Sequence, residues 1–218
     1  YIIDMDKLNF IKSNPLFDKL NQNPLVKKIV ILVLIFTLTI VVMYFVNVGV
    51  VNSLLRRHDS PMIFEASKNA KNSIIVSQDP SNENSVMIYR SDNQDGIEFT
   101  YSFWFAIENM EYKFGEWKHM FHKGNKTSYP NRAPGVFIHP DKNSIRIYMN
   151  TMQNILEYVD IDNIPVQRWV HMAISLNHKY LDVYVNGRLK KRHEFTSTPK
   201  QNFGDLWVNL FGGFEGYL

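Results

Sequence analysis

The sequence predicts a mainly β protein, an antiparallel sandwich or barrel, preceded by a single membrane-spanning helix. From Ile97 onward, short stretches rich in aromatic and β-branched residues follow a period of two and are separated by turn residues. Before them, residues 29–49 form a run without a charged side chain. Many short alternating strands are typical of sandwiches and barrels, whereas about 20 apolar residues are enough to cross a bilayer as a helix.

Composition and charge exclude several classes of function. The chain has 218 residues, enough for one soluble domain of about 150 residues beside a membrane anchor. A net charge of +3, with no basic stripe interleaved with aromatic residues, argues against nucleic acid as a partner. Cysteine is absent, which excludes disulfides, thiolate metal sites and a thiol nucleophile.

Residues 1–28 are predicted to form an N-terminal arm with short helices. The tripeptide Asn-Pro-Leu begins at residue 14 and again at residue 23. Asparagine is a favoured N-cap and proline suits the first helical position, so helices are expected to begin near Leu16 and Leu25. Such an arm either docks on a partner or a membrane surface, or is a partly ordered tail.

Residues 29–51 are predicted to be the transmembrane helix. Two lysines precede the uncharged run and two arginines follow it. Its polar residues, Thr37, Thr39 and Asn47, are compatible with a span because such side chains can bond back to the preceding turn. The run is too long for a cleavable signal peptide, and a buried core segment is the alternative. The slight excess of basic residues before the run favours an inner N-terminus.

A linker over residues 52–73 is expected to connect this helix to the β region. Asn186-Gly187 is the strongest hairpin signal of that region, because both residues tolerate a positive φ. Trp104 and Trp169 are predicted to be core anchors. The strand candidates are Ile74–Val76, Val86–Tyr89, Ile97–Ile107, Glu116–Lys123, Val136–His139, Ile145–Met149, Ile155–Ile161, Trp169–Leu176, Leu181–Val185, Leu189–Phe195 and Leu206–Leu210.

Several motifs of the β region are recognisable together. They are F-T-Y-S-F-W-F from Phe99, W-K-H-M-F-H-K-G from Trp117, P-x-x-x-W-x-H from Pro165 followed by D-V-Y-V-N-G from Asp182, and G-G-F-E-G-Y-L from Gly212. This pattern resembles the concanavalin A-like, or laminin-G-like, jelly rolls over roughly residues 97–218. The resemblance implies a concanavalin A-like β-sandwich over residues 74–218. It also implies a closing strand after the last motif. Because the sequence stops at Leu218, that strand is expected to be missing and a sheet edge to be open.

The combination of an anchor with an Asn- and Lys-rich domain of this kind is similar to proteins of large nucleocytoplasmic DNA viruses, the giant viruses. That similarity implies a structural, single-pass membrane protein of the virion, a minor component that links the viral membrane to the capsid. The implied partners are the lipid bilayer and capsid or other virion proteins. A membrane-displayed, lectin-like glycan-binding module is the alternative.

An enzyme is the least favoured class. Glycoside hydrolases of this fold use paired carboxylates on one face of a strand. The nearest stretch here contains Glu157, Asp160 and Asp162, with the wrong spacing. We therefore predict no catalytic residue and no cofactor.

No metal site is predicted either. Acidic residues near loops, Asp141, Asp160, Asp162 and Asp205, are candidate calcium ligands, but solvated turn residues are the favoured interpretation. His119 and His122 are three residues apart and are therefore expected on opposite faces of their strand, where they cannot share a zinc ion.

The long loops within residues 109–134 hold the candidate glycan or partner surface. Its residues are Tyr112, Phe114, Trp117, Tyr129 and Asn131. Aromatic side chains with a few polar groups are typical of ligand sites, but the same residues can pack the loops, and packing is the favoured interpretation. Asn125-Lys126-Thr127 is a sequon, so Asn125 is a possible glycosylation site if the domain is lumenal.

Overall fold

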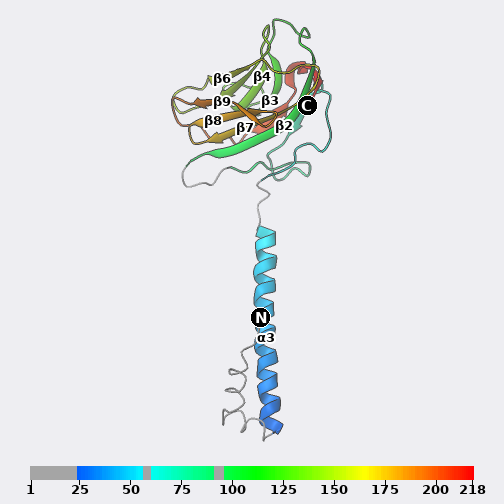
Figure 1. The fold of residues 1–218 in the computed structure, drawn as a ribbon, viewed down its shortest axis with the longest axis vertical. Coiled ribbons are helices and arrows are strands. Elements are labelled where there is room, and N and C mark those ends of the chain that lie inside the picture. The colour runs from blue at the N-terminus through cyan, green and yellow to red at the C-terminus, as the bar shows by residue number, and fades with distance from the viewer. Residues whose placement is uncertain (1–23, 56–59, 91–95) are drawn as a thin grey trace. The chain divides into compact units, whose positions relative to one another are not determined.

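The computed structural model describes residues 24–55, 60–90 and 96–218. The chain divides into two compact units, 1–58 and 59–218. The first contains helix α3 (Pro24–Leu55), and the second contains two β-sheets (Figure 1). The arm predicted for residues 1–28 lies outside the described residues as far as residue 23, and so do residues 56–59 of the predicted linker.

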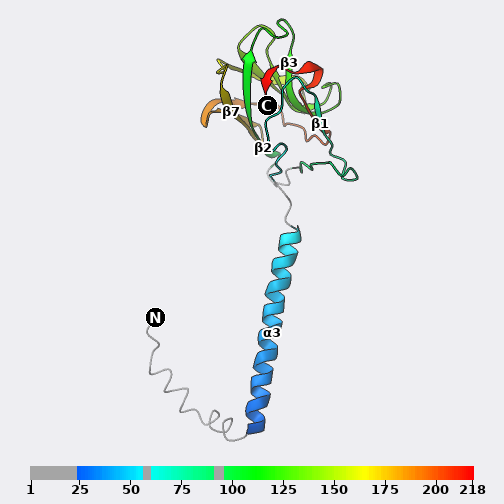
Figure 2. The same cartoon turned by 90° about the vertical axis from the view of Figure 1, so that its right-hand side faces the viewer.

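Helix α3 is one continuous helix (Figure 2). Its segment Pro24–Val50 is long and apolar enough to cross a membrane. The polar side chains within it are bonded to their own helix: Thr37 Oγ1 donates to Leu34 O at 2.9 Å, Thr39 Oγ1 to Ile35 O at 2.6 Å, and Asn47 Nδ2 to Met43 O at 2.9 Å. The helix therefore presents few unpaired polar groups despite these residues.

The second unit is an antiparallel sandwich of two sheets, which confirms the predicted fold class. The six-stranded sheet has the order β1 (Ile74–Val76), β10 (Asp205–Val208), β3 (Lys118–Gly124), β4 (Arg132–Ile138), β5 (Ser144–Met149) and β6 (Glu157–Asp162). The five-stranded sheet has the order β11 (Glu215–Tyr217), β2 (Glu98–Asn109), β7 (Trp169–Asn177), β8 (Tyr180–Val185) and β9 (Arg188–Glu194). A short 3₁₀ turn, η1 (Leu210–Gly212), joins β10 to β11.

The core lies between the two sheets and follows the alternation of the strands. Every second residue of β7 faces inward, so Val170, Met172 and Ile174 are fully buried. On the facing sheet, Ile145 and Ile147 of β5 are buried in the same way. The intervening residues of each strand point to the outer faces, which therefore hold the functional candidates.

Two predicted core anchors lie outside this core. Trp104 is 57% exposed and Trp169 is 47% exposed. In the register of β2 and β7, Trp104 lies opposite His171, and the buried side chains of β7 begin at Val170. Because side chains alternate, Trp169 shares the outer face with His171 rather than the inner face with Val170. The prediction that Trp104 and Trp169 anchor the core is wrong.

A second prediction that fails is the strand over Val86–Tyr89. The described chain forms no ladder there. Instead, the side chain of Gln78 replaces a strand partner: its Nε2 donates to Val86 O at 2.8 Å and its Oε1 accepts from Ile88 N at 2.8 Å. One side chain thus satisfies backbone groups that the periodicity assigned to a sheet.

The hairpin predicted at Asn186-Gly187 is confirmed. It joins β8 to β9, and both residues have positive φ, 49° for Asn186 and 77° for Gly187. The Asn186 side chain also accepts a hydrogen bond from His171 N at 3.0 Å. This bond ties the turn to the neighbouring strand β7.

The sheet edge after the last motif differs from the expected open edge. The motif residues themselves form β11, which pairs with the end of β2. On the other side of β11, Lys68 N donates to Leu218 O at 2.7 Å and Ala70 N donates to Gly216 O at 2.9 Å. The chain therefore covers the β11 edge with its own residues 68–70 along this stretch.

Candidate functional site

The outer face of the six-stranded sheet carries arginines and aromatic rings in adjacent rows. Register places Gly135, Tyr148 and Tyr158 in one row across β4, β5 and β6. The next row contains Phe137, Arg146 and Asp160. We call this surface the arginine–aromatic face. Its members are Trp117, Arg132, Phe137, Arg146, Tyr148, Tyr158 and Asp160.

Each arginine of this face lies over an aromatic ring. The guanidinium carbon of Arg132 is 3.7 Å from the ring centre of Tyr148. That of Arg146 is 3.6 Å from the ring centre of Tyr158 and 4.9 Å from that of Trp117. Stacking of this kind holds a guanidinium flat and in place. The face is therefore a fixed surface of planar groups.

The two arginines differ in their charge partners. Arg146 forms a bidentate pair with Asp160, with Nε–Oδ1 and Nη2–Oδ2 distances of 2.7 Å. Hydrogen bonding to Asp160 raises the pKa of Arg146, against the opposing effect of burial. Burial lowers the pKa of Arg132, and the nearby charge of Arg146 adds to this lowering. Among the described residues, no carboxylate pairs with Arg132.

Gly135 explains how Arg132 reaches Tyr148. A Cβ atom at Gly135 would lie 3.1 Å from Arg132 Cβ and 3.2 Å from Arg132 Cδ. The missing side chain thus leaves space for the arginine stem, which runs along β4 past this residue. Without glycine here, the stem of Arg132 would have to shift.

Trp117 and Tyr158 are the exposed rings of the face. Trp117 is 39% exposed and Tyr158 is 45% exposed. His139 packs against the edge of Trp117, with ring centres 4.9 Å apart, and Tyr148 lies 6.4 Å from Trp117 and 5.7 Å from Tyr158. Neighbouring rings thus support both exposed ones.

The five surface residues predicted from the sequence do not form one platform. Trp117 belongs to the arginine–aromatic face. Phe114 is 68% exposed and Tyr129 is 56% exposed, each at a loop. Asn131 braces its own loop, because its carbonyl accepts from Asn125 N at 3.1 Å and its amide donates to Asn125 Oδ1 at 3.3 Å.

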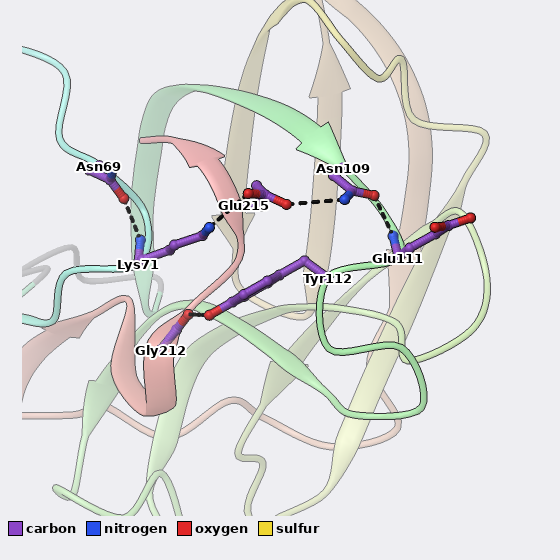
Figure 3. A network of polar contacts seen from close by, with 7 residues as sticks. All are labelled: Asn69, Lys71, Asn109, Glu111, Tyr112, Gly212 and Glu215. Carbon is purple, nitrogen blue, oxygen red and sulfur yellow. Dashed lines mark hydrogen bonds and ion pairs between the residues drawn. The ribbon is translucent and has the colours of Figure 1, made fainter.

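Tyr112 packs into a polar network beside β11. Its hydroxyl donates to Gly212 O at 3.0 Å, and Lys71 Nζ lies 4.7 Å above its ring (Figure 3). In the same network, Lys71 pairs with Glu215 at 2.7 Å, and Glu215 accepts from Asn109 Nδ2 at 3.1 Å (Figure 3). The network joins the start of the domain, its last strand and the loop after β2, which is a packing role.

Two buried histidines lie beside this face, and they were expected on opposite sides of β3. Instead, His119 Nε2 and His122 Nδ1 are 2.7 Å apart. The register of β3 shifts between His119 and Phe121, so a bulge brings both side chains to one face. The expectation of opposite faces is therefore wrong.

Hydrogen bonding fixes the tautomers of both histidines. Leu210 N donates to His119 Nδ1 at 3.0 Å, so the proton of His119 is on Nε2 and is donated to His122. His122 Nε2 then donates to Asn125 O at 2.6 Å. Burial lowers the pKa of His119 to about 3 and also lowers that of His122. Both rings are therefore neutral at pH 7.

Most of the acidic residues considered for catalysis or calcium have local partners. Asp160 binds Arg146, and Asp205 Oδ1 accepts from Gln78 N at 2.8 Å. The buried Glu157 accepts from the hydroxyls of Thr151 and Thr196 at 3.0 Å each. In the described part of the chain, no group of three acidic or histidine side chains is placed to hold a metal ion.

Arg132, Arg146, Tyr148 and Tyr158 were not among the surface residues predicted from the sequence. The signal that points to them is alternation: Arg146 and Tyr148, like Tyr158 and Asp160, are two residues apart and must share a face. What the pattern cannot give is the pairing of β5 with β6, which brings Arg146 beside Asp160.

A second surface is an apolar groove at the open part of β2, which we call the β2 groove. It has a volume of about 550 Å³. Within the described residues, β11 pairs with β2 only at Ala106, Ile107 and Asn109, so the edge of Phe99–Phe103 that faces away from β7 has no backbone partner. The groove is lined by Phe64, Tyr101, Phe103, Phe121, Leu206 and Val208, among others.

Comparisons with known proteins agree with the sandwich. The sequence profile of the concanavalin A-like lectin/glucanases superfamily matches residues 67–213, more than half of the chain. No curated protein matches the sequence.

Solved structures resemble the chain at low identity. The receptor binding domain of botulinum neurotoxin D is 15% identical, with a TM-score of 0.44 over 70% of this chain and 38% of that one. The CBM40 of Ruminococcus gnavus IT-sialidase is 10% identical, with a TM-score of 0.43 over 56% of this chain and 72% of that one. Domains LG4-5 of the mouse laminin alpha1 chain are 5% identical, with a TM-score of 0.41 over 70% and 39%. The chain thus spans less than two thirds of the toxin and laminin structures.

Proposed function

Because the chain belongs to the concanavalin A-like lectin/glucanases superfamily, we propose that it is a non-catalytic glycan-binding module displayed on a membrane by helix α3. The observation that carries the proposal is the arginine–aromatic face. Its exposed rings, Trp117 and Tyr158, flank the Arg146–Asp160 pair.

A sugar needs both kinds of group that this face offers. The apolar face of a pyranose can pack on an exposed ring, and its hydroxyls can bond to a few fixed polar groups. Arg146 donates and Asp160 accepts, and their mutual bidentate pair fixes their directions. A preorganised surface loses little conformational entropy when a ligand binds.

The placement of the nearby acids supports a binding role over hydrolysis. Hydrolysis by this fold would need two free carboxyl groups on one face. Glu157 is buried and bonded to two threonines, whereas Asp160 is bonded to Arg146 on the outer face.

The proposed anchor is the apolar part of helix α3. Its span of Pro24–Val50 exceeds the length that a bilayer core requires, and every residue of it from Ile29 to Phe45 is exposed. A core helix of a soluble protein would be buried, so this exposure supports contact with lipid.

A glycan array tests the proposal with the full chain in detergent or nanodiscs. We expect specific binding to some glycans and a loss of at least about tenfold in Trp117→Ala, because the exposed ring is the stacking surface. Phe114→Ala is the matched control, since Phe114 is also an exposed aromatic residue but lies outside the face. Absence of any glycan binding would refute the function, and equal loss in both variants would refute the site.

A second candidate is favoured by the β2 groove. In this proposal the protein is a structural, minor component of a giant-virus virion, and its domain ties the viral membrane to the capsid. The unpaired edge of Phe99–Phe103 would accept a strand from a capsid or membrane protein, whose apolar side chains would fill the groove.

Cross-linking of intact particles tests the tether. A stable interface of this kind buries about 1,200–2,000 Å² in total, so cross-links should join residues around the groove to one virion protein. Specific sugar binding, without cross-links from the domain to virion proteins, would reject the tether in favour of the glycan-binding module.

A further inference from the structure

We infer that the arginine–aromatic face selects acidic glycans, those that carry a carboxylate or a sulfate, and that Arg132 is the residue that recognises the acidic group. The inference rests on the proposed glycan-binding function and specifies the ligand class. It comes from one difference between the two arginines of the face.

The charges of the face do not balance. Arg146 is neutralised by its bidentate contact with Asp160. Arg132 has no carboxylate partner among the described residues. Lys191 adds a further positive charge at the edge of β6, where its Nζ donates to Asp160 O at 3.3 Å. One guanidinium thus remains available for an anion.

Arg132 is also held in a fixed position without a carboxylate partner. Its Nε is buried and makes no hydrogen bond, and its guanidinium carbon lies 3.7 Å from the ring centre of Tyr148 and 5.5 Å from that of Phe137. The side chain as a whole is half-buried. Buried donors normally have partners, and the exceptions call for an explanation. Because this Nε is closed off from solvent, an anion would meet the terminal nitrogens of the guanidinium and give the side chain a charged partner.

The geometry of the rings suits an acidic sugar better than a free anion. Tyr148 contacts both Arg132 and Trp117, with ring centres of Tyr148 and Trp117 6.4 Å apart. A sugar stacked on Trp117 therefore lies beside Arg132. Its carboxylate or sulfate can accept two parallel hydrogen bonds from the guanidinium fork. The ring contributes stacking and the acidic group contributes selectivity.

The test compares acidic glycans with their neutral counterparts, using the full chain in nanodiscs at physiological salt. One arm uses a carboxylate-bearing sugar and its reduced or asialo partner, and the other uses a sulfated oligosaccharide and its desulfated partner. We expect at least about tenfold tighter binding of the acidic member in one arm or both, the typical effect of a charge-assisted bidentate contact. The arm with the larger preference identifies the acidic group.

Variants then assign the preference to Arg132. Arg132→Gln should abolish the acidic preference, measured as the ratio of acidic to neutral binding, while Arg132→Lys, which keeps the charge without the fork, should keep part of it. Arg188→Gln is the control, because Arg188 is an exposed arginine of β9 on the other sheet. A thermal unfolding transition close to that of the parent chain shows that each variant is folded.

The outcomes separate the inference from the function it rests on. Equal binding of acidic and neutral glycans, or an acidic preference that survives Arg132→Gln, would overturn the inference and leave the glycan-binding function standing. Failure to bind any glycan would overturn both.

Discussion

At the scale of single residues, His119 and His122 form a relay that requires neutral rings. A proton on His119 Nδ1 would point at Leu210 N–H, and a proton on His122 Nδ1 would point at His119 Nε2–H. Burial is the main cause of the lowered pKa of both residues. The relay therefore links the stability of this part of the sandwich to pH.

The stability of the domain should fall as pH is lowered from 7 to 5. The folded pKa of His119, about 3, lies below its ordinary value of about 6.5 in an unfolded chain. Between pH 7 and pH 5, His119 therefore takes up a proton in the unfolded state but not in the folded state. Each proton bound only by the unfolded state lowers the unfolding free energy by up to about 1.4 kcal/mol for every pH unit of acidification. Denaturant titrations at several pH values measure the slope.

The variant His119→Gln provides the control for this dependence, because glutamine keeps one acceptor and one donor without titrating. The slope of its unfolding free energy against pH should be smaller than that of the parent chain, by the amount that corresponds to about one bound proton. A slope equal to that of the parent chain would show that His119 is not the group responsible.

Trp169 and Phe105 should respond differently to truncation. Phe105 is fully buried, so Phe105→Ala should lower the unfolding free energy by about 3–5 kcal/mol. Trp169 is 47% exposed and packs on Tyr217 with ring centres 6.1 Å apart, so Trp169→Ala should cost only about 1–2 kcal/mol. Equal losses in urea unfolding would mean that Trp169 is a core residue after all.

The residue scale is also where sequence reasoning was least successful. Aromatic character was taken as a sign of burial, which placed Trp169 on the wrong face of β7. The histidines were misplaced because a bulge in β3 leaves no mark in the spacing of the residues. Arg132 reaches Tyr148 only because Gly135 leaves space for its stem. No local pattern in the sequence specifies this contact between residues of two different strands.

At the scale of elements, most strands could be predicted because their signals are local. Alternating apolar residues gave β2 and β5 to β10 to within a few residues, and the Asn186-Gly187 dipeptide gave a hairpin. The failures involve long-range partners. Val86–Tyr89 bonds to the Gln78 side chain, and β11 depends on residues 68–70 for one of its edges.

Two turn glycines should differ in how they tolerate alanine. A Cβ at Gly187 meets nothing within 4 Å, so Gly187→Ala should cost only the strain of its φ of 77°, about 1–2 kcal/mol. Gly187→Val should cost more because valine is β-branched. A Cβ at Gly213 would lie 1.9 Å from Ala70 O, so Gly213→Ala should cost roughly 2–5 kcal/mol from strain and overpacking together.

Thermal and chemical unfolding of the three variants measure this order. The Gly213→Ala clash would also separate residues 68–70 from β11, since Phe214 N donates to Ala70 O at 3.3 Å beside it. If Gly213→Ala were no more destabilising than Gly187→Ala, the packing of residues 68–70 on the last strand would be incorrect.

At the scale of the whole molecule, the proposed function requires that helix α3 cross a membrane. Leu38→Arg places a charge within the apolar segment and should cost about 2.5–3.5 kcal/mol of insertion free energy. We expect the parent chain to stay in the membrane after alkaline carbonate extraction, and the variant to insert less efficiently. A parent chain that stayed soluble without detergent would contradict the anchor.

The account as a whole depends on one claim, that ligands bind the arginine–aromatic face rather than the β2 groove or the loops. A structure of the full chain with the tightest-binding glycan from the array tests this most directly. We predict a sugar ring against Trp117 or Tyr158 and an acidic group within hydrogen-bonding distance of Arg132. A ligand bound elsewhere on the sandwich, with this face empty at saturating glycan, would contradict the account.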